Sequence, residues 1–236
     1  MLKKQIKKIV YKIIPKTLLE HARFEYSSLF GRMFAKDLML DRVKKNYINL
    51  GCGGVYIDNM INIDFFSNKN KDYGLDLRYP FRIDTECVDG IFSDHTFEHL
   101  SHSEIDNALS ESLRILKQGG KIRIIVPDMS IFIRKYCEDD DAWFNKWKDT
   151  VLKDKSRHYM HQYFSKIFAL NFTSNFYFHQ SSWDFNMAKL LLEKNGFENV
   201  KKYSFMTGTS ELLYDKDLED RKLISLYVEA SKGYDI

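Results

Sequence analysis

The sequence predicts an α/β fold, in which a doubly wound, mostly parallel sheet binds its ligand across the carboxyl ends of the strands. From residue 47 onward the predicted order is strand, turn, strand, strand, helix, strand, insertion, helix, strand, strand. Several apolar runs stop at glycine or aspartate, which is typical of buried parallel strands that end in polar turns. The 236 residues, 44% of them hydrophobic and 29% charged, suffice for one complete domain with appendages.

Three strands are predicted before the first helix of this domain. Tyr47–Leu50 is a short apolar run stopped by the glycine turn of residues 51–54, and Met60–Ile63 is a second run stopped by Asp64. Asp89–Ser93 is the third. The first two are expected to be buried parallel strands, because each is apolar throughout and ends in a polar turn.

A capping pattern opens the next helix. Ser101 is followed three positions later by Glu104, and we expect the glycine pair 119–120 to end the helix that starts there. Lys121–Val126 then forms a β-branched run that stops at residues 127–128. This run is the strongest strand prediction in the chain.

The second half of the chain interrupts the alternation before resuming it. Tyr136–Trp183 holds 13 of the 35 aromatic residues in 48 positions. It is either a helical insertion that covers the active-site edge as a lid, or a helical pair that packs its aromatic side chains into a satellite core. A helix is then expected from residues 181–184 to 195–196, followed by strands near Val200–Phe205 and Leu223–Ala230.

Residues 1–45 are expected to form a basic, amphipathic helical extension. Its lysines interleave with isoleucine and valine at helical spacing ahead of the first acidic residue, Glu20. The first helix should span residues 1–14 and close at Pro15, with further helix over residues 17–45. Such a helix suits the anionic inner leaflet of a membrane, or else it docks on its own domain or on a second subunit.

The charge distribution restricts the partners. Residues 1–50 hold 12 Lys or Arg against 4 Asp or Glu, whereas residues 51–236 hold 24 against 29. The mildly acidic body argues against a nucleic-acid partner, because phosphate contacts require a basic face. Cys52, Cys87 and Cys137 are too few for a disulfide scaffold, and no run approaches the roughly 18 apolar residues of a spanning helix. We therefore expect a cytoplasmic protein.

Six segments occur in order: Asn49–Gly54, Asn62–Asp64, Asp76–Leu77, Ser93–Leu100, Glu111–Gly120 and Val126–Asp128. Together they resemble the motifs of class I S-adenosylmethionine-dependent methyltransferases, in particular the predicted methyltransferases of bacterial surface-polysaccharide gene clusters. The resemblance covers residues 47–128 well and the tail more loosely. It implies a Rossmann-like sheet with an antiparallel final strand, a methyltransferase domain over residues 46–236, and S-adenosylmethionine as cofactor.

The residues themselves are compatible with such a ligand. Asp64, at the end of a strand, can accept hydrogen bonds from both hydroxyls of a ribose. Tyr56 stands where a dinucleotide fingerprint requires its third glycine, so a ribose–adenine ligand without a pyrophosphate remains.

The resemblance implies nine cofactor-binding residues. The residues of the glycine turn would lie along the methionine part of the cofactor, and Asp64 would bind its ribose. Asp76 and Leu77 would flank the adenine, and the segment 93–95 would line the side of the sulfonium. The full set is Asn49, Gly51, Cys52, Gly53, Asp64, Asp76, Leu77, Ser93 and Asp94.

Two departures from the family pattern concern this set. Asn49 stands where the family usually has Asp or Glu. Only 13 positions separate Gly51 from Asp64, which are too few for the full helix that normally follows the glycine turn. The contribution of a helix N-terminus to cofactor binding is therefore in doubt.

Methyl transfer to a hydroxyl requires a base, and three residues are candidates. His95 follows the third predicted strand, Asp128 follows the strand Lys121–Val126, and His179 precedes the late helix. No metal is assigned, although His95, Glu98 and His99 resemble the metal-coordinating segment of certain methyltransferases and leave a divalent cation open as an alternative.

The leading hypothesis is an O-methyltransferase that acts on a sugar hydroxyl of a bacterial surface glycan, with residues 1–14 in peripheral contact with the inner membrane. One alternative is methylation of a small amine or phenolic metabolite. Another is a non-catalytic, cofactor-binding scaffold subunit. The oligomeric state is left open.

Overall fold

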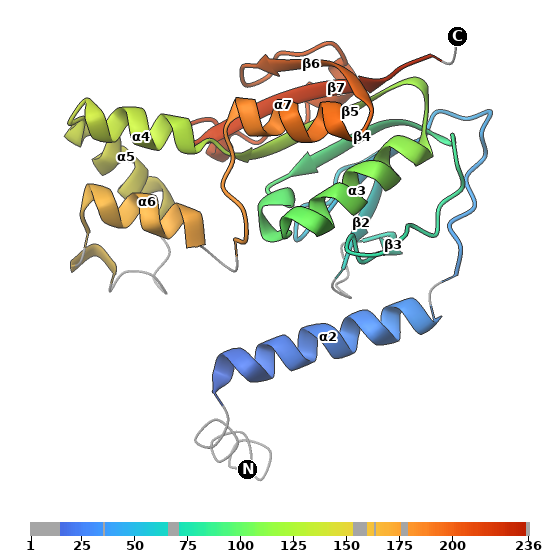
Figure 1. Ribbon diagram of the computed structural model, residues 1–236, viewed down its shortest axis with the longest axis horizontal. Helices are drawn as coiled ribbons and strands as arrows, with labels where there is room; N and C mark the ends of the chain where they lie inside the picture. Colours follow the sequence, from blue (N-terminus) through green and yellow to red (C-terminus); the bar gives the residue numbers. More distant parts are fainter. Residues whose placement is uncertain are drawn as a thin grey trace.

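The computed structural model describes residues 15–34, 36–65, 71–152, 160–162, 164–175 and 179–234. Its centre is a seven-stranded sheet of order β3-β2-β1-β4-β5-β7-β6 (Figure 1). β7 runs antiparallel to both of its neighbours, and the other pairings are parallel. The strands are β1 Tyr47–Leu50, β2 Ile61–Asp64, β3 Tyr73–Gly74, β4 Val88–Asp94, β5 Leu116–Pro127, β6 Phe197–Tyr203 and β7 Ser225–Lys232. The Rossmann-like fold class with an antiparallel final strand is thereby confirmed.

The helices follow the predicted order more closely than the predicted bounds. They are α2 Lys16–Phe34, α3 His102–Ile115, α4 Met129–Cys137, α5 Asp141–Val151, α6 Lys166–Asn175, α7 Phe185–Lys194 and α8 Glu211–Tyr214, with 3-10 turns η1 Phe97–His99 and η4 Glu219–Arg221. The capping pattern before α3 is present, since the Ser101 amide donates to the Glu104 carboxylate at 2.7 Å.

The glycine pair 119–120 does not end α3, so that prediction was wrong. The helix stops at Ile115, and β5 begins at the next residue. Val88 of β4 pairs with Leu116 and Gly90 pairs with Lys121, so β5 carries extra residues between these two pairs. A Cβ at Gly120 would lie 2.7 Å from the Lys117 carbonyl oxygen. The glycines therefore serve a bulge inside the strand.

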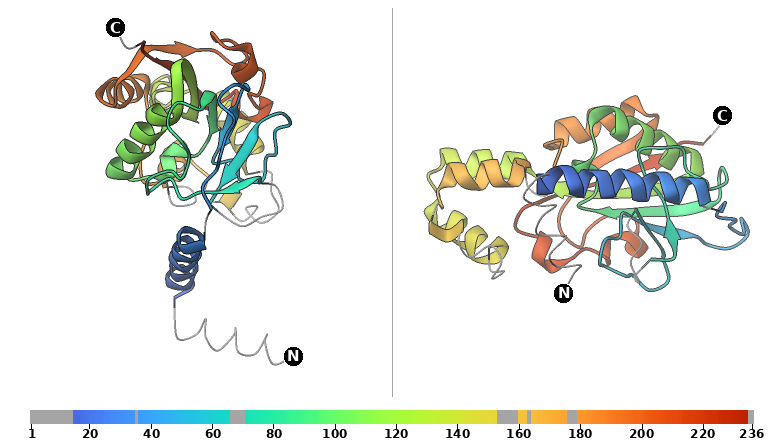
Figure 2. Two further views of the ribbon diagram at one scale, coloured as in Figure 1. Left: turned by 90° about the vertical axis from the view of Figure 1, so that its right-hand side faces the viewer. Right: turned by 90° about the horizontal axis from the view of Figure 1, so that it is seen from below.

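The two faces of the sheet are covered differently. α3 and α7 lie on one face (Figures 1 and 2), where the larger core includes Ile91, Ile105, Leu109 and Leu192. The other face carries a smaller cluster formed with Leu213 of α8. The connection from β1 to β2 is free of helix, in agreement with the 13 positions that separate Gly51 from Asp64. Helices of ten or more residues thus cover only one face of the sheet in the described part of the chain.

An extensive ion-pair network ties the loop before β7 to this second face. Arg123 of β5 is fully buried and donates to both carboxylate oxygens of Asp217, at 2.7 and 2.5 Å, and to Glu229 of β7 at 3.0 Å. It also donates to the Thr207 carbonyl, while the Met206 amide donates to Asp217. The network holds the loop over the sheet without an apolar helix.

α4, α5 and α6 form a helical lobe beside the sheet (Figure 1). The aromatic-rich insertion therefore starts at Met129 rather than at residue 136. Phe132, Phe144 and Trp147 are fully buried in a separate cluster, where their rings make edge-to-face contacts with neighbouring aromatic rings. The aromatic side chains of this lobe pack mainly against one another, as a satellite core does.

α2 lies against the edge of the domain next to β3 (Figures 1 and 2). Phe24 stacks on Phe65, Glu25 pairs with Arg78 at 2.6 Å, and the Ser28 hydroxyl donates to Asp76. The helix ends at Phe34, so the helical prediction over residues 35–45 was wrong where the structure describes the chain. Instead, Leu38 bridges to Ile83 as an extended residue.

The predicted basic helix over residues 1–14 lies outside the described residues. None of the described helices meets the length and hydrophobicity needed to span a membrane.

Candidate functional site

A cavity opens at the carboxyl ends of β1 and β4. Its volume is about 140 Å³, which is below the roughly 300–1,000 Å³ of sites that enclose a whole small molecule. Its position is the crevice that open α/β sheets use for ligands. The lining residues are Asn49, Gly51, Cys52, Gly53, Gly54, Val55, Phe92, Asp94, His95, Leu218 and Arg221.

The glycine turn has the backbone that its sequence suggests. Gly51 has a φ of 76°, and a Cβ there would lie 2.2 Å from the Thr96 hydroxyl oxygen. Gly53 has a φ of 54°, and a Cβ there would meet no atom within 4 Å. Gly51 is required because the Thr96 side chain leaves no room for a Cβ. Gly53 borders open space in which a ligand can approach the backbone.

Cys52 and Asp64 flank this turn. The Gly53 amide donates to the Asp64 carboxylate at 2.8 Å, which connects the end of β2 to the turn. Burial, together with the nearby Asp64 charge, raises the pKa of the Cys52 thiol to about 11. A protonated thiol is a poor nucleophile, so Cys52 acts as a small buried wall of the cavity.

The hydrogen bonds of Asn49 explain why an amide, and not a carboxylate, stands at this position. Its amide nitrogen donates to the Val55 carbonyl at 3.0 Å and to the Asn62 side-chain oxygen at 2.9 Å. An ionised carboxylate at this position has no hydrogen to donate and would leave both acceptors without these bonds. The asparagine therefore holds the helix-free β1–β2 connection in place.

Asp94 and Arg221 provide the charges of the cavity. Asp94 Oδ2 lies 3.4 Å from Arg221 Nε, while the buried Oδ1 accepts no hydrogen bond from the described residues. Burial raises the pKa of the Asp94 carboxyl, and the neighbouring His95 and Arg221 oppose that rise. Sequence analysis missed Arg221, because η4 lies in a polar loop without a recognisable motif.

The methionine end of S-adenosylmethionine carries an ammonium and a carboxylate, and this cavity offers a partner for each. The Asp94 carboxylate suits the ammonium, and the Arg221 guanidinium suits the carboxylate. The open space beside Gly53 allows close approach of the ligand to the backbone. The residues present therefore fit this cofactor at its methionine end.

The other predicted cofactor residues do not line this cavity. The Asp76 carboxylate pairs with Arg78 at 2.9 Å and binds Ser28, Leu77 lies in the core, and the Ser93 hydroxyl donates to the Leu50 carbonyl. Asp64 adjoins the turn through Gly53. Of the nine predicted residues, the structure brings five together in the cavity, namely Asn49, Gly51, Cys52, Gly53 and Asp94.

His95 joins the cavity to a buried carboxylate. Its φ is 49°, its Nε2 lies 2.8 Å from the Ser225 hydroxyl, and its Nδ1 lies 3.2 Å from Glu98 Oε1. Burial alone raises the pKa of Glu98, but the neighbouring His95, His99 and His179 outweigh it, and the pKa stays below its usual value. An ionised carboxylate beside Nδ1 favours hydrogen on that nitrogen and leaves Nε2 as the basic atom.

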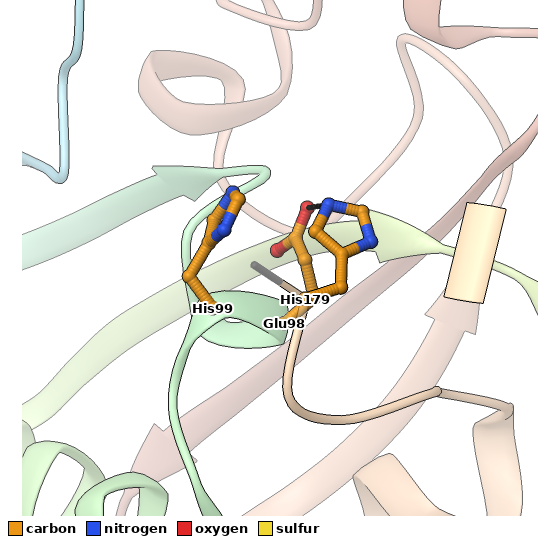
Figure 3. A group of neighbouring side chains, drawn as sticks. All are labelled: Glu98, His99 and His179. Carbon is orange, nitrogen blue, oxygen red and sulfur yellow. Dashed lines mark ion pairs between the residues drawn. The ribbon is translucent and has the colours of Figure 1, made fainter. Parts of the chain in front are cut away.

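The remaining catalytic candidates lie outside the cavity lining. Asp128 is fully buried and caps α4, where one of its carboxylate oxygens accepts from the Ser130 amide and the other from Lys202. His179 donates from Nδ1 to the Thr173 carbonyl at 2.7 Å, and its Nε2 lies 3.8 Å from Glu98 (Figure 3). Burial lowers the pKa of His179, and Glu98 opposes that effect.

A family profile described as "Methyltransferase domain" matches residues 76–124, which run from the segment after β3 into β5. This match indicates a methyltransferase domain in that part of the chain, and the strand order with the antiparallel β7 agrees with it. No curated protein matches the sequence.

Several solved structures with a similar backbone fold are methyltransferases, and three of them illustrate this likeness. An S-adenosylmethionine-dependent methyltransferase from Archaeoglobus fulgidus shares 15% identity, with coverage of 96% of this chain and 99% of that one and a TM-score of 0.44. One from Thermotoga maritima, described as a possible histamine N-methyltransferase, shares 14%, covering 94% and 99% with a TM-score of 0.46. A TehB-like methyltransferase from Corynebacterium glutamicum shares 13%, covering 87% and 86% with a TM-score of 0.44.

Proposed function

We propose that this protein methylates a hydroxyl group, and that its acceptor is a sugar hydroxyl of a bacterial surface glycan. The observation that supports a hydroxyl acceptor is His95. Its imidazole lies at the cavity wall, and an ionised carboxylate lies behind its Nδ1. A hydroxyl must lose its proton during the transfer, whereas a neutral amine or a thiolate needs no base to attack. The glycan is supported by the motif resemblance over residues 47–128.

When bound, S-adenosylmethionine supplies a methyl group activated by its sulfonium. Asp94 and Arg221 hold the two charged groups of the methionine end, and the turn at Gly51 and Gly53 brings the backbone close to it. Asp64 accepts the ribose hydroxyls. An acceptor hydroxyl that replaces Ser225 at His95 Nε2 gives its proton to that atom, while Glu98 stabilises the imidazolium that forms.

The direct test is incubation of the chain with S-adenosylmethionine labelled in its methyl group and a glycan–lipid extract. We expect label in a product that is stable to mild base and becomes a methylated sugar on hydrolysis. Label in an amine or phenol fraction instead would identify a small-metabolite enzyme. Cofactor binding without transfer to any fraction would identify a scaffold subunit and reject the proposal.

Asp94→Asn should weaken S-adenosylmethionine binding by about 10–150-fold, which corresponds to the roughly 1.5–3 kcal/mol of a hydrogen bond to a charged group. Isothermal titration calorimetry measures this change. The matched control is Asp89→Asn at the other end of β4, because Asp89 pairs with Lys117 at 2.7 Å, outside the cavity lining. Equal affinities of both variants and the wild type would place the ammonium elsewhere.

We also propose peripheral contact with an anionic membrane. α2 exposes a stripe of apolar residues on the side away from Asp76 and Arg78, and its Tyr26, Phe30 and Phe34 rings follow one another along it. The lysines of the preceding sequence supply the matching positive charge. The stripe consists of Leu18, Tyr26, Leu29, Phe30, Met33 and Phe34.

The full chain should therefore sediment with vesicles that contain phosphatidylglycerol, and added salt should release it, because lysine attraction is screened within a Debye length. Deletion of residues 1–14 and Phe30→Glu should each abolish sedimentation. Ser27→Glu adds the same charge beside the stripe, and this variant should still sediment with the vesicles. Undiminished binding of both altered chains, or equal binding to neutral phosphatidylcholine vesicles, would refute membrane contact.

A further inference from the structure

Glu98, His99 and His179 form a cluster that no part of the proposed mechanism requires as a unit. Glu98 and His99 lie on η1, directly after the cavity strand β4, and His179 lies in the segment between α6 and α7. The three side chains converge on one space (Figure 3), and one potential ligand atom from each lies within 4.8 Å of the others.

Within this cluster, the Glu98 carboxylate is the group whose burial requires a compensating cation or hydrogen-bond donor. Its side chain is 1% exposed, and neither carboxylate oxygen accepts a hydrogen bond from the described residues. The nearest described polar group is His95 Nδ1, 3.2 Å from Oε1. A buried carboxylate is costly unless it is hydrogen-bonded, paired with a cation or bound to a metal.

His179 is oriented as metal-binding histidines are. Its Nδ1 must carry hydrogen, because it donates to the Thr173 carbonyl oxygen at 2.7 Å. That hydrogen bond directs Nε2 towards Glu98 Oε1, 3.8 Å away. A backbone carbonyl on the far nitrogen is a typical outer partner of a ligating imidazole, since it fixes both the tautomer and the direction of the ring.

The segment that carries His179 is itself fixed on η1. The amides of Gln180 and Ser181 donate to the Glu98 carbonyl at 2.8 and 3.2 Å, and the Gln180 side chain donates to the His99 carbonyl at 2.8 Å. The His99 and His179 rings meet edge to face at 4.7 Å between centroids. The backbone therefore holds two imidazoles and one carboxylate in place at the same time.

We infer that Glu98, His99 and His179 bind one divalent transition-metal ion, of the kind that two imidazoles and one carboxylate select, such as Zn²⁺, Mn²⁺ or Co²⁺. Ligands at about 2.0–2.2 Å from a tetrahedral zinc ion lie about 3.3–3.6 Å apart. The 3.8 Å pair is near this spacing, and the side chains must move closer wherever their ligand atoms are separated by up to 4.8 Å. Three protein ligands leave positions open for oxygen ligands.

The site adjoins the cavity through His95, which lines the cavity and lies 3.2 Å from Glu98. An acceptor hydroxyl bound to the ion would lose its proton more readily, because a metal lowers the pKa of a bound oxygen acid. This role rests on the proposed hydroxyl acceptor, whereas the presence of the site does not.

The test measures metal binding without turnover. The full chain, free of any polyhistidine tag, is dialysed against a chelator and titrated with Co²⁺, and both its visible absorption and the bound metal are measured. We expect one ion per chain with a ligand-field spectrum. His99→Ala and His179→Ala should each weaken binding by more than the roughly 10–100-fold that loss of an outer partner costs.

His102→Ala is the matched control, because this exposed histidine lies three residues after His99 on α3 and should bind metal as the wild type does. Glu98→Gln keeps the shape and should also lose the ion, with circular dichroism confirming the fold. His95→Ala should retain the ion even where methyl transfer is lost, which separates this inference from the proposed function. A wild-type chain that binds no Co²⁺, or one whose affinity is unchanged in the His99 and His179 variants, overturns it.

Discussion

His95→Ala is expected to lower the turnover number for methyl transfer by about 10²–10⁴-fold, the usual contribution of a positioned general base. His95 lines the cavity, and Glu98 behind Nδ1 leaves Nε2 as the atom that takes the proton. The affinity for S-adenosylmethionine should change little, because Asp94, Arg221 and the glycine turn remain. Single-turnover kinetics and calorimetry on the same variant separate the two quantities.

Ser225→Ala is the matched control for His95. It removes the hydroxyl that lies 2.8 Å from Nε2 but leaves the imidazole and Glu98 in place, so turnover should stay within about tenfold of the wild type. If His95→Ala loses cofactor affinity but not rate, His95 belongs to the cofactor wall. The base would then be Asp128 or His179, and the hydroxyl-transfer mechanism described above would be rejected.

Arg123→Ala should lower the free energy of unfolding by about 3–5 kcal/mol, the usual cost of removing one partner from a buried ion pair. The change would leave Asp217 and Glu229 charged in the interior, where their remaining described donors are the loop amides of Met206 and Thr209 and the Thr209 hydroxyl. Urea unfolding followed by circular dichroism measures the loss. Cofactor affinity should fall as well, because the anchored loop leads directly to Leu218 and Arg221 of the cavity.

Lys121→Ala provides the comparison on the same strand. Lys121 donates to the Thr209 carbonyl of the same loop at 3.0 Å, but from an exposed position, so its loss should cost no more than about 1 kcal/mol. Should Arg123→Ala unfold at the same urea concentration as Lys121→Ala, the network would not be what holds the loop.

The cavity residues show why one half of the site could be predicted. Gly51, Gly53 and Asp94 each lie directly after or at the end of a strand that its own apolar residues define, and the carboxyl ends of parallel strands meet at one edge. Arg221 reaches the same edge from a loop 127 residues after Asp94 in the chain. No local pattern marks it, because the buried Arg123–Asp217 pair, not the local sequence, sets its position.

The sequence by itself determined six of the seven strands and their order along the chain, the capped helix α3, and the absence of a full helix between β1 and β2, because these depend on neighbouring residues and on chain length. The short strand β3 was not predicted. Only the tertiary structure decided three contacts. Asn49 donates to Asn62, Ser28 of α2 donates to the Asp76 carboxylate, and His179 lies beside Glu98 and His99. These contacts join residues 13 to 81 positions apart, whose meeting depends on how the whole chain packs and on no pattern within either segment.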